Sequence, residues 1–465
     1  MFRRSSVLTS ALALSAFSII AQNPIPVPAQ TVTQDSNDWP MYNHDVRGTR
    51  FNPAETILTR DSARRLKIKW VFPTKGDVYA TPSVVNNVVY AGDISGTFYA
   101  LTNTGKLLWS TTGFGPITDS ALVINDGADG IVIFGDQTGF IYGLKRSTGQ
   151  RLWFVQPNAS GFPAIFSSPI LAAGKVIVGI SSFETSTDFH GSVVALDPET
   201  GTVIWQTYLA EAPASGAGVW STPTYDAGTE TVYVTTANNY GEPTTDTSDA
   251  FVALDVRTGN ILWKHQCVAG DTGNIEADIG DSPQFYALPD GTKVVGAGQK
   301  ETGTYWVVNA DPAKNGALVG SVQAVPSCTG SEGLFADSAV DEAGGTVFVN
   351  GVNCRIPSKP PFIPPTGQVV ALKSDASATV WEFTSWFAPV LSGVAVANGV
   401  VYFQASGLFS ILYALDAKTG RVLAGVLTSG GISGPSVSNG RVYVGTGTKF
   451  ASGVPTPTAI VALGP

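Results

Sequence analysis

One short pattern recurs along the chain and constrains its fold more than any other feature. A β-rich run is followed by a turn that contains Thr-Gly and then by a second run that ends in Trp. Three later copies are looser, and four are clear: Gly96…Thr104-Gly105…Trp109, Gly139…Thr148-Gly149…Trp153, Gly191…Thr200-Gly201…Trp205 and Ala250…Thr258-Gly259…Trp263. A fixed period of this kind indicates repeated units that must stack to bury their apolar faces.

Another short β-rich run precedes each unit, and these runs number eight. They are Val88–Gly92, Ile131–Gly135, Lys175–Gly179, Thr231–Thr235, Lys293–Ala297, Thr346–Asn350, Val400–Gln404 and Arg441–Gly445. Small-residue steps lie upstream of most of them, such as Thr81-Pro82, Ser168-Pro169, Thr222-Pro223, Ser282-Pro283 and Gly434-Pro435. Alternating β-branched and aromatic residues bounded by Gly, Asn and Asp predict strands joined by tight turns. Four short strands in a period of about 40–50 residues describe one blade of a β-propeller.

The two ends of the chain complement each other. Ala459–Leu463 is an inner strand without its Thr-Gly-Trp partner, and Leu66–Trp70 is an outer strand without an inner one. Pairing the two would complete the last blade and remove free sheet edges. The sequence therefore predicts an all-β fold: one eight-bladed β-propeller over residues 38–465, closed by its N- and C-terminal strands. The repeated Trp is expected to pack between adjacent blades.

Composition excludes several other classes of protein. The 465 residues include 51 Gly, and only 14% are charged, which does not suit a coiled coil or a helical bundle. Hydrophobic residues make up 43%, too many for a disordered chain. The formal net charge of −9 argues against binding to a phosphate backbone, so no nucleic-acid partner is expected.

The first residues have the layout of a secretory signal peptide. Arg3 and Arg4 precede an apolar run from Val7 to Ile20, and a Pro-rich stretch follows. We expect a signal peptide over residues 1–22, a Pro-rich polar linker over 23–37, and a secreted, extracellular protein. A signal anchor is the alternative for the apolar run. No later stretch approaches the ~20 apolar residues of a membrane span.

Cysteine usage and one sequon add expectations for an oxidising compartment. Cys328 and Cys354 flank one predicted strand pair and are expected to form a disulfide, which leaves Cys267 as a buried free thiol. Asn158-Ala159-Ser160 is a candidate glycosylation site. The chain contains no Cys-x-x-Cys-His, so no c-type haem is expected.

The segment before the repeats carries a family resemblance. Asp38-Trp39-Pro40-Met41-Tyr42-Asn43-His44-Asp45, continuing to Arg50-Phe51-Asn52, resembles the opening of the polyvinyl-alcohol-dehydrogenase branch of the quinoprotein alcohol dehydrogenases. The repeat itself is similar to that of enzymes that use pyrroloquinoline quinone (PQQ). The resemblance extends from about Trp39 to Leu463 and implies a secreted oxidoreductase that oxidises an alcohol with PQQ and Ca²⁺.

Three segments match the family's site motifs. Ser181-Ser182-Phe183-Glu184 resembles the stretch whose glutamate binds Ca²⁺, so the resemblance implies Glu184 as a metal ligand and Ser182 as a cofactor contact. Trp220 occupies the position of the tryptophan that stacks on PQQ. Asn238 occupies the metal-binding asparagine position, although Ala237 replaces the usual Gly.

The third segment implies the chemistry. Asp278 matches the family's catalytic base and also a metal ligand, and Lys300 matches the residue that hydrogen-bonds the quinone. These residue types suit their roles, because Ca²⁺ prefers carboxylate and amide oxygens and proton abstraction from an alcohol needs a positioned carboxylate. A cation stabilises charge that develops on a quinone oxygen, and an aromatic ring supports a planar cofactor. Without a haem, the electrons must pass to an external acceptor.

Several departures keep a second interpretation open. The family's PQQ-binding arginine has no clear counterpart, since Asp119-Ser120 lies near that place, and Phe335-Ala336 stands where a late-blade Trp is usual. The alternative is a non-catalytic propeller that has lost PQQ and binds a carbohydrate or a protein. An enzyme with another acceptor is a further possibility. Each site residue also has an ordinary interpretation: Trp220 as one more inter-blade ring, Asp278 and Asn238 as turn residues, and Glu184 and Lys300 as surface charges. Asp281 is interpreted as a turn residue.

Overall fold

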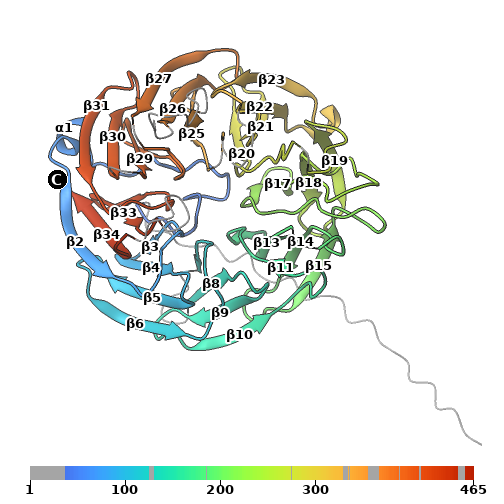
Figure 1. Ribbon diagram of the computed structural model, residues 1–465, viewed down its shortest axis with the longest axis horizontal. Coiled ribbons are helices and arrows are strands. Elements are labelled where there is room, and N and C mark those ends of the chain that lie inside the picture. Colours follow the sequence, from blue (N-terminus) through green and yellow to red (C-terminus); the bar gives the residue numbers. More distant parts are fainter. Residues whose placement is uncertain are drawn as a thin grey trace, which may run out of the picture.

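The repeated strands form eight sheets arranged as a ring (Figure 1). The computed structural model describes residues 37–124, 130–184, 186–273, 275–327, 333–334, 336–353, 366–386, 388–407, 410–448 and 456–465. Each sheet contains four antiparallel strands, with two extra short strands joined to two of the sheets. The predicted eight-bladed β-propeller is therefore confirmed. The expected signal peptide (1–22), the expected linker up to residue 36 and the Cys328–Cys354 disulfide fall on residues outside the described ranges.

The blades follow one another around the ring in chain order, and each begins with its innermost strand. Blade 1 contains β3 (Ser83–Val85), β4 (Val88–Gly92), β5 (Thr97–Thr102) and β6 (Leu107–Thr112). Blade 2 contains β7 (Leu122–Ile124), β8 (Ile131–Gly135), β9 (Ile141–Lys145) and β10 (Arg151–Val155). Blade 3 contains β12 (Ile170–Ala172), β13 (Lys175–Ser182), β14 (Ser192–Leu196) and β15 (Val203–Tyr208), and the short strand β11 (Pro163–Ala164) pairs with β13. Blade 4 contains β16 (Thr224–Asp226), β17 (Thr231–Thr235), β18 (Ala250–Asp255) and β19 (Ile261–Gln266).

The second half of the ring repeats this arrangement. Blade 5 contains β20 (Gln284–Ala287), β21 (Lys293–Gly298), β22 (Thr304–Asn309) and β23 (Leu318–Gln323). Blade 6 contains β24 (Ala339–Asp341), β25 (Thr346–Asn353), β26 (Thr366–Lys373) and β27 (Thr379–Ser385). Blade 7 contains β28 (Ala395–Ala397), β29 (Val400–Ala405), β30 (Ile411–Asp416), β31 (Val422–Leu427), with β1 (Phe51–Asn52) beside β28. Blade 8 contains β32 (Ser436–Ser438), β33 (Arg441–Gly445), β34 (Ala459–Gly464) and β2 (Lys67–Pro73). The described residues also form two short helices, α1 (Arg60–Ala63) and the 3₁₀ turn η2 (Pro312–Lys314).

Blade 8 closes the ring by joining the two ends of the described chain. Its outer strand β2 pairs antiparallel with β34, and Trp70 lies opposite Ala462 in the register. This is the pairing that the complementary end strands predict. Because it replaces two free edges with a hydrogen-bonded ladder, the ring has no gap between its first and last blades.

The repeated Trp packs between adjacent blades, as predicted. In five blades the indole N–H donates to a carbonyl oxygen of the following blade at 2.8–3.0 Å, and the donors are Trp70, Trp109, Trp153, Trp205 and Trp381. The same rings lie against the Gly of the next blade's turn, for example Trp109 against Gly149. Thr-Gly and Trp are therefore two halves of one contact, which explains their fixed spacing.

Replacing Gly149 with alanine is expected to destabilise the propeller by about 2–4 kcal/mol. Gly149 has φ +71°, and an added Cβ would lie 2.4 Å from Cε3 of Trp109, so backbone strain and overpacking add. Gly174→Ala is the matched control, since Gly174 has φ +74° with no atom within 4 Å of the added Cβ and pays only the strain. Thermal unfolding of both variants gives the comparison, and equal losses would contradict the predicted role of the Trp contact.

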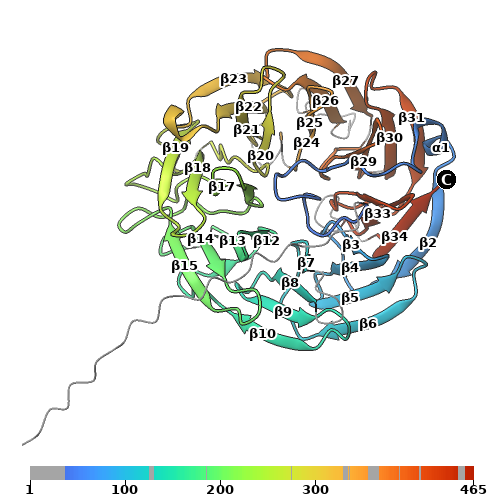
Figure 2. The same ribbon diagram turned by 180° about the vertical axis from the view of Figure 1, so that it is seen from behind.

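A segment before the first blade crosses the face of the ring that Figure 2 turns toward the viewer. We call residues 37–52 the strap, and in Figure 2 the adjoining blue chain runs inward from α1 at the rim. Backbone or side-chain hydrogen bonds of 2.7–2.9 Å connect the strap to the innermost strand of seven blades, at Val84, Val123, Tyr225, Phe285, Val340, Val396 and Val437. These bonds satisfy polar groups at the inner edges of the sheets. The sequence did not predict this role for the segment.

Arg50 fixes the strap at its far end. This side chain is fully buried, and its guanidinium donates to the carbonyl oxygens of Val394 at 2.6 Å, Tyr42 at 2.7 Å and Pro435 at 3.2 Å. Val394 and Pro435 directly precede the innermost strands of blades 7 and 8. One buried cation therefore connects the strap to two blades.

A second ring of contacts connects neighbouring blades at the small-residue steps. The N–H groups of Ser120, Ser168 and Thr222 each donate to a side-chain hydroxyl of the following blade, those of Ser168, Thr222 and Ser282 respectively, at 2.9–3.2 Å. At the next step the N–H of Ser282 donates to Oδ1 of Asp337 at 2.6 Å. The predicted Ser-Pro and Thr-Pro steps thus line the inside of the ring.

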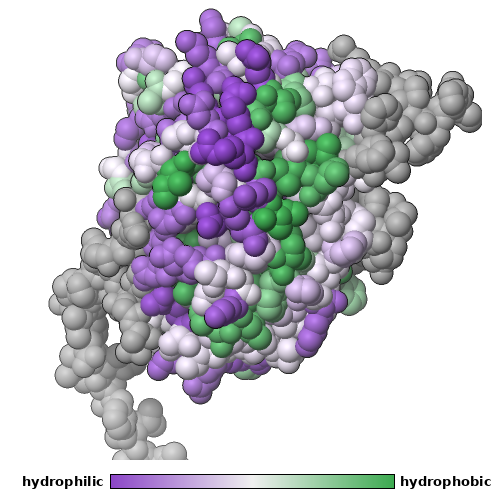
Figure 3. Space-filling model, turned by 90° about the vertical axis from the view of Figure 1, so that its left-hand side faces the viewer, coloured by the Kyte–Doolittle hydropathy of each residue, from purple (hydrophilic) through white to green (hydrophobic). Residues whose placement is uncertain are grey.

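The rim carries hydrophobic patches among hydrophilic ones (Figure 3). They include exposed aliphatic side chains of the outer strands, such as Ile68 and Val71 of β2 and Val422 and Leu427 of β31. Within the described residues, none of the helices is long and apolar enough to cross a membrane.

The structure describes two residues for which the sequence raised expectations, Cys267 and Asn158. Cys267 is a free thiol as expected, but it is partly exposed and not buried. Asn158 is only 6% exposed, and its Nδ2 donates to the carbonyl oxygen of His190 at 3.4 Å. Glycosylation of Asn158 stays a prediction.

Candidate functional site

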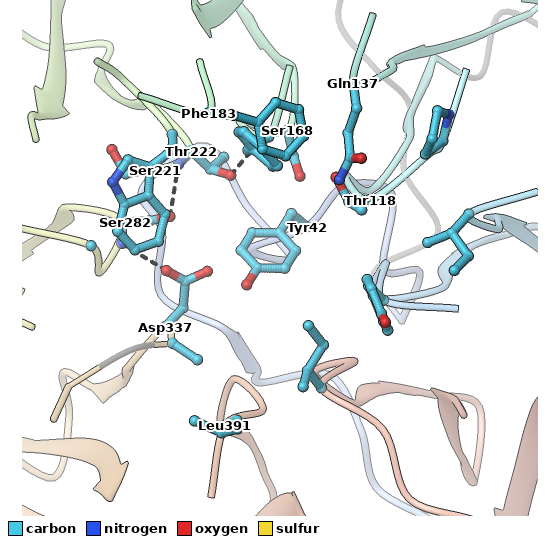
Figure 4. Close-up of a pocket in the computed structure, with 18 residues that line it drawn as sticks. Tyr42, Thr118, Gln137, Ser168, Phe183, Ser221, Thr222, Ser282, Asp337 and Leu391 are labelled. Atoms are coloured by element: carbon cyan, nitrogen blue, oxygen red, sulfur yellow. Dashed lines mark hydrogen bonds between the residues drawn. The ribbon is translucent and has the colours of Figure 1, made fainter. Parts of the chain in front are cut away.

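A cavity of about 580 Å³ lies inside the ring (Figure 4). Aromatic and aliphatic side chains from several blades form most of its wall, including Phe166, Phe183, Leu391 and Ile432. Trp220 and Gly280 contribute another part of this wall. An added Cβ at Gly280 would lie only 2.1 Å from Cη2 of Trp220, so this position needs Gly for the indole to lie flat against the backbone.

The sequence-predicted site residues gather behind this wall. Trp220 hydrogen-bonds through its side chain to Asp278, the residue predicted as the catalytic base. The backbone N–H of Asn238 donates to Oδ1 of Asp278 at 3.0 Å. Lys300 lies on the other side, with its Nζ 3.6 Å from Oδ2 of Asp278. The Trp220 side chain, the Asn238 backbone N–H and the Lys300 ammonium, all from loops of blades 4 and 5, therefore converge on the Asp278 carboxylate.

Backbone hydrogen bonds hold the two loops of blade 5 together. The N–H of Lys300 donates to the carbonyl oxygen of Asp278 at 2.9 Å, and Nε2 of Gln299 donates to the carbonyl oxygen of Ala277 at 2.7 Å. Lys300 lies two residues after β21, and Asp278 precedes β20, so antiparallel pairing of these strands places both loops at the same end of the blade. The close approach of Asp278 and Lys300 thus follows from the pairing of β20 and β21.

Asp278 and Lys300 shift each other's proton affinity in opposite directions. Burial raises the pKa of Asp278, and the Lys300 ammonium and the Asn238 N–H offset part of this rise. Burial acts to lower the pKa of Lys300, but Asp278 and then Glu301 and Glu276 outweigh it and raise that pKa. Lys300 therefore stays protonated beside a carboxyl group that holds its proton more tightly than usual.

Asn238 has an oxygen available for a cation. Its Nδ2 donates to the carbonyl oxygen of Asn239 at 2.7 Å, which fixes the orientation of the amide. The Oδ1 atom is buried and has no hydrogen-bond partner among the described residues. A buried amide oxygen without a donor is costly unless a ligand satisfies it.

Glu184 lies near Asp278 but is more exposed. It follows β13 in a left-handed conformation with φ +59°. Its side chain is exposed to solvent, yet nearby protein atoms and then the Asp278 carboxylate raise the pKa of Glu184 to about 7. Ser182, predicted as a cofactor contact, shares a hydrogen bond of 2.9 Å with the Tyr240 hydroxyl and accepts one from the Glu184 N–H. Its hydroxyl is thus already engaged by protein.

The donor set suits a hard cation. Two carboxylates, Glu184 and Asp278, and the amide oxygen of Asn238 are the ligand types that Ca²⁺ prefers. In the part of the chain that the structure describes, no group of three or more His, Cys, Asp or Glu side chains is arranged to hold a metal ion. The candidate site therefore depends on the amide oxygen as well as on the acids.

Two buried acids behind the site escaped the sequence analysis. Glu301 is 2% exposed, with Oε1 3.5 Å from Nζ of Lys300, and burial raises its pKa to about 8. Asp249 is fully buried, and neither of its carboxylate oxygens has a partner within the described ranges. Burial and then the Asp278 charge raise the pKa of Asp249 to about 9. Only the position of Glu301 next to Lys300 in the sequence could have pointed to it.

Replacing Asp249 with asparagine is expected to stabilise the protein at alkaline pH. The pKa of Asp249 is about 9 in the folded chain and about 3.9 in an unfolded one, so between these values only the folded state keeps the proton. The contribution of this residue to stability therefore falls as pH rises. We expect the variant to unfold about 2–4 °C above the wild type at pH 8, with a smaller gap at pH 5. A variant that unfolds at a lower temperature than the wild type at pH 8 would contradict this prediction. An equally large rise in unfolding temperature for the exposed control Asp290→Asn would contradict it too.

One residue had been interpreted too simply. Asp281 was expected to be a turn residue, but it is fully buried between blades 5 and 6. Its carboxylate accepts from the N–H groups of Gly298 and Ser338 at 3.0 Å and from Nε2 of Gln284 at 2.9 Å. Burial and the neighbouring Asp337 raise its pKa well above the usual value. It therefore connects blades, and its role is structural.

The cavity itself is poor in positive charge. Among the described lining residues there is no Lys, Arg or His, and Asp337 is the one ionisable acid. Asp119, near the place of the family's arginine, is 2% exposed, and its Oδ2 accepts from the Gly135 N–H at 2.7 Å. Thr118, Gln137 and Ser168 are the neutral polar groups on this side.

Comparisons with known proteins support the β-propeller fold. The family model described as "Outer membrane protein assembly factor BamB" (PQQ_2) matches residues 52–283 and 365–454. The polyvinylalcohol dehydrogenase of a Pseudomonas species is 28% identical over 88% of this chain and 73% of its own length. The polyvinylalcohol dehydrogenase of a Sphingopyxis strain is 25% identical over 89% of this chain and 73% of its own.

A solved structure shows the same fold. The quinohemoprotein alcohol dehydrogenase of Comamonas testosteroni superposes with a TM-score of 0.75 at 18% identity, covering 94% of this chain and 82% of its own. At this identity the likeness concerns the fold alone. This structural likeness and the family match over most of the repeats agree on a PQQ-repeat β-propeller fold. The chain belongs to the PQQ_2 family of PQQ-repeat β-propellers, and it is similar to polyvinylalcohol dehydrogenases over most of its length.

Proposed function

We propose that this protein is a secreted oxidoreductase that oxidises an alcohol with PQQ and Ca²⁺. The observation that carries the proposal is the buried Asp278 carboxyl, which Trp220, Asn238 and Lys300 surround behind the Trp220 wall of the cavity. The names of the relatives, which are alcohol dehydrogenases, support the same substrate class. The apolar run after Arg3 and Arg4 is the support for secretion.

The residues present fit the metal and the ring system of the cofactor. Glu184, Asn238 and Asp278 would hold Ca²⁺, because the unsatisfied Asn238 oxygen needs a cation. Trp220 would support the planar cofactor, and Lys300 would donate to a quinone oxygen. When bound, PQQ would accept the electrons that the alcohol loses.

The protein's own part in the reaction is to manage a proton. An Asp278 oxygen would take the hydroxyl proton of the substrate, since a carboxylate within hydrogen-bond reach can act as a general base. The raised pKa of Asp278 makes it a stronger base than an exposed aspartate. The protonated Lys300 would keep its charge next to the reacting group because four carboxylates, Asp278 foremost, raise its pKa.

The proposal is tested by oxidation of a secondary alcohol with PQQ, Ca²⁺ and an artificial electron acceptor. We expect turnover that requires both additions and is lost when EDTA removes the metal. A small-molecule or polymeric alcohol and an external acceptor are the implied partners. Absence of turnover for a range of primary and secondary alcohols, with the cofactor demonstrably bound, would contradict the proposal.

One observation favours a second candidate. PQQ carries carboxylates, and the described lining of the cavity offers them neutral donors such as Thr118 and Gln137 but no cation. A propeller that has lost PQQ and binds a carbohydrate or a protein would not need a cation in this lining. Binding of a polysaccharide that is equally strong before and after EDTA treatment, in a protein that does not bind PQQ, would support this candidate.

A further inference from the structure

A buried carboxyl group lies next to the Lys300 ammonium. It belongs to Glu301, in the turn between β21 and β22, and its side chain is only 3% exposed. Its Oε1 lies 3.5 Å from Nζ of Lys300. Neither carboxylate oxygen has a hydrogen-bond partner within the described ranges. Among the described residues, the polar contact of this carboxyl group is thus an ion pair with Lys300.

Folding alone gives no reason for an acid at this position. Burying a carboxylate without hydrogen-bond donors costs free energy, and attraction to one ammonium offsets this cost only in part. Glutamine has nearly the same shape as glutamate and carries no charge, so it would occupy the same space at a lower cost. The contribution of Glu301 is therefore expected at the site and not in the fold.

Hydrogen bonds fix the backbone of the turn that carries Lys300 and Glu301. The Lys300 N–H donates to the carbonyl oxygen of Asp278 at 2.9 Å, and the Lys300 carbonyl oxygen accepts from the Leu334 N–H at 3.1 Å. The Gly303 N–H donates to the carbonyl oxygen of the residue before Lys300 at 3.2 Å and closes the turn. With the backbone fixed, the part that still needs a partner to hold it is the long, flexible side chain of Lys300.

Three carboxylates surround the Lys300 ammonium at similar distances but with different exposure. From Nζ, Oε2 of Glu276 lies at 3.4 Å, Oε1 of Glu301 at 3.5 Å and Oδ2 of Asp278 at 3.6 Å. The Glu276 side chain is 43% exposed, whereas those of Asp278 and Glu301 are 4% and 3% exposed. Solvent weakens an exposed ion pair much more than a buried one. Asp278 and Glu301 are thus the two partners that hold Lys300 inside the protein, and Asp278 is also the proposed base.

We propose that Glu301 is a positioning residue, whose carboxylate holds the Lys300 ammonium beside Asp278 and away from solvent. Its charged form pairs with Lys300, and its neutral form releases Lys300. The role of Lys300 toward a quinone oxygen rests on the proposed function, but the pairing of Glu301 with Lys300 does not. The site would then depend on a residue that touches neither the substrate nor the cofactor.

The pairing is expected to depend on pH in one direction. Burial raises the pKa of Glu301 to about 8, so the group is neutral below this value and charged above it. Lys300 is therefore held more tightly as pH rises through about 8. The charged and titratable groups around Glu301 are Lys300, Glu276 and Asp278 of blade 5 and Asp249 of blade 4. Glu301→Gln leaves all four in place, so comparison with the wild type at one pH isolates the charge of Glu301.

The test measures how readily a reagent reaches Lys300 in the full-length protein without added cofactor. Acetic anhydride is pulsed at pH 6.5 and at pH 9.5, and mass spectrometry gives the acetylation of Lys300 relative to the exposed Lys106. At pH 9.5 we expect Glu301→Gln to raise the labelling of Lys300 about tenfold over the wild type, the value of one hydrogen bond to a charged group. At pH 6.5 we expect a difference within twofold, because glutamine and the neutral acid carry the same charge. In the wild type alone, the relative labelling of Lys300 should fall from pH 6.5 to pH 9.5.

Glu276→Gln is the matched control, because it makes the same chemical change at 3.4 Å from Nζ of Lys300 but in an exposed side chain. We expect it to leave the labelling of Lys300 within twofold of the wild type at both pH values. Thermal unfolding separates positioning from a structural role. The folded protein holds the Glu301 proton up to a pKa of about 8, against about 4.3 in an unfolded chain, so this residue favours folding less as pH rises. Glu301→Gln should therefore unfold at or above the wild-type temperature at pH 9.5, and a lower temperature would overturn the positioning role.

Turnover gives a second measurement. With PQQ and Ca²⁺ at pH 9.5, we expect Glu301→Gln to lower kcat about tenfold and to leave KM for the alcohol within twofold, because Lys300 would act on a quinone oxygen and not on the substrate. Equal labelling of Lys300 in the wild type and in folded Glu301→Gln at pH 9.5, or an equal effect of Glu276→Gln, would overturn the positioning role. So would wild-type labelling that does not fall with pH. If the labelling behaves as expected but no alcohol is oxidised, the positioning role stands and the proposed function fails.

Discussion

Asp278→Asn is expected to lower kcat for alcohol oxidation by about 100- to 10 000-fold, the range of general-base catalysis. Asparagine has nearly the same shape and can still accept the Asn238 N–H, which now reaches Oδ1 at 3.0 Å. It cannot accept a proton, however, and it removes a negative charge from the proposed metal site. The measurement is steady-state turnover at saturating PQQ and Ca²⁺, with thermal unfolding as a check on the fold.

Glu276→Gln is the control for the loss of charge near Lys300. The Glu276 side chain is 43% exposed, and its Oε2 lies 3.4 Å from Nζ of Lys300 on the solvent side. We expect a less than tenfold change in kcat, since an exposed ion pair contributes little. Equal effects of the two substitutions would show that Asp278 acts only through the local charge.

Arg50→Met is expected to lower the free energy of unfolding by about 3–5 kcal/mol. The substitution leaves the carbonyl oxygens of Tyr42, Val394 and Pro435 buried without this donor. Each unsatisfied buried acceptor costs about 1–3 kcal/mol. Because two of the carbonyls belong to blades 7 and 8, the loss falls where the strap meets the closing blades. Denaturant or thermal unfolding of the two proteins gives the difference.

Arg47→Met provides the comparison within the same strap. The Arg47 guanidinium lies 2.7 Å from Oε2 of Glu342, but its side chain is 42% exposed. Such a surface pair is worth about 0–1 kcal/mol, so this variant should unfold close to the wild type. A small effect of Arg50→Met, similar to that of Arg47→Met, would mean that the strap does not stabilise the ring.

The ring was predictable because its signals are local. Each Thr-Gly turn requires a positive φ, and each repeated Trp lies against the Gly of the next blade's turn, so the sequence carries both halves of these joints. The closing pair β2 and β34 followed from two incomplete repeats. The strap was not predictable in the same way. Its contacts are mostly backbone hydrogen bonds, which leave no periodic side-chain pattern to find.

The candidate site was predicted in part, through its resemblance to a family. Trp220, Asn238, Asp278 and Lys300 do converge, because each follows or precedes a strand at the same end of its blade. Asp249 and Glu301 were missed because their burial comes from the packing of distant loops. Asp281 was misjudged for the same reason, since loop acids usually cap turns. Burial of a loop residue is a tertiary property that a local pattern does not report.

Titration of the protein's tryptophan fluorescence with PQQ tests the central claim most directly. In the presence of Ca²⁺ we expect saturable quenching with a Kd at or below micromolar, because the cofactor would lie on Trp220. EDTA should weaken the binding at least tenfold, and the double variant Glu184→Ala with Asp278→Ala should abolish the effect of Ca²⁺. A protein that shows no binding at micromolar PQQ, or binding that ignores Ca²⁺, would contradict the account.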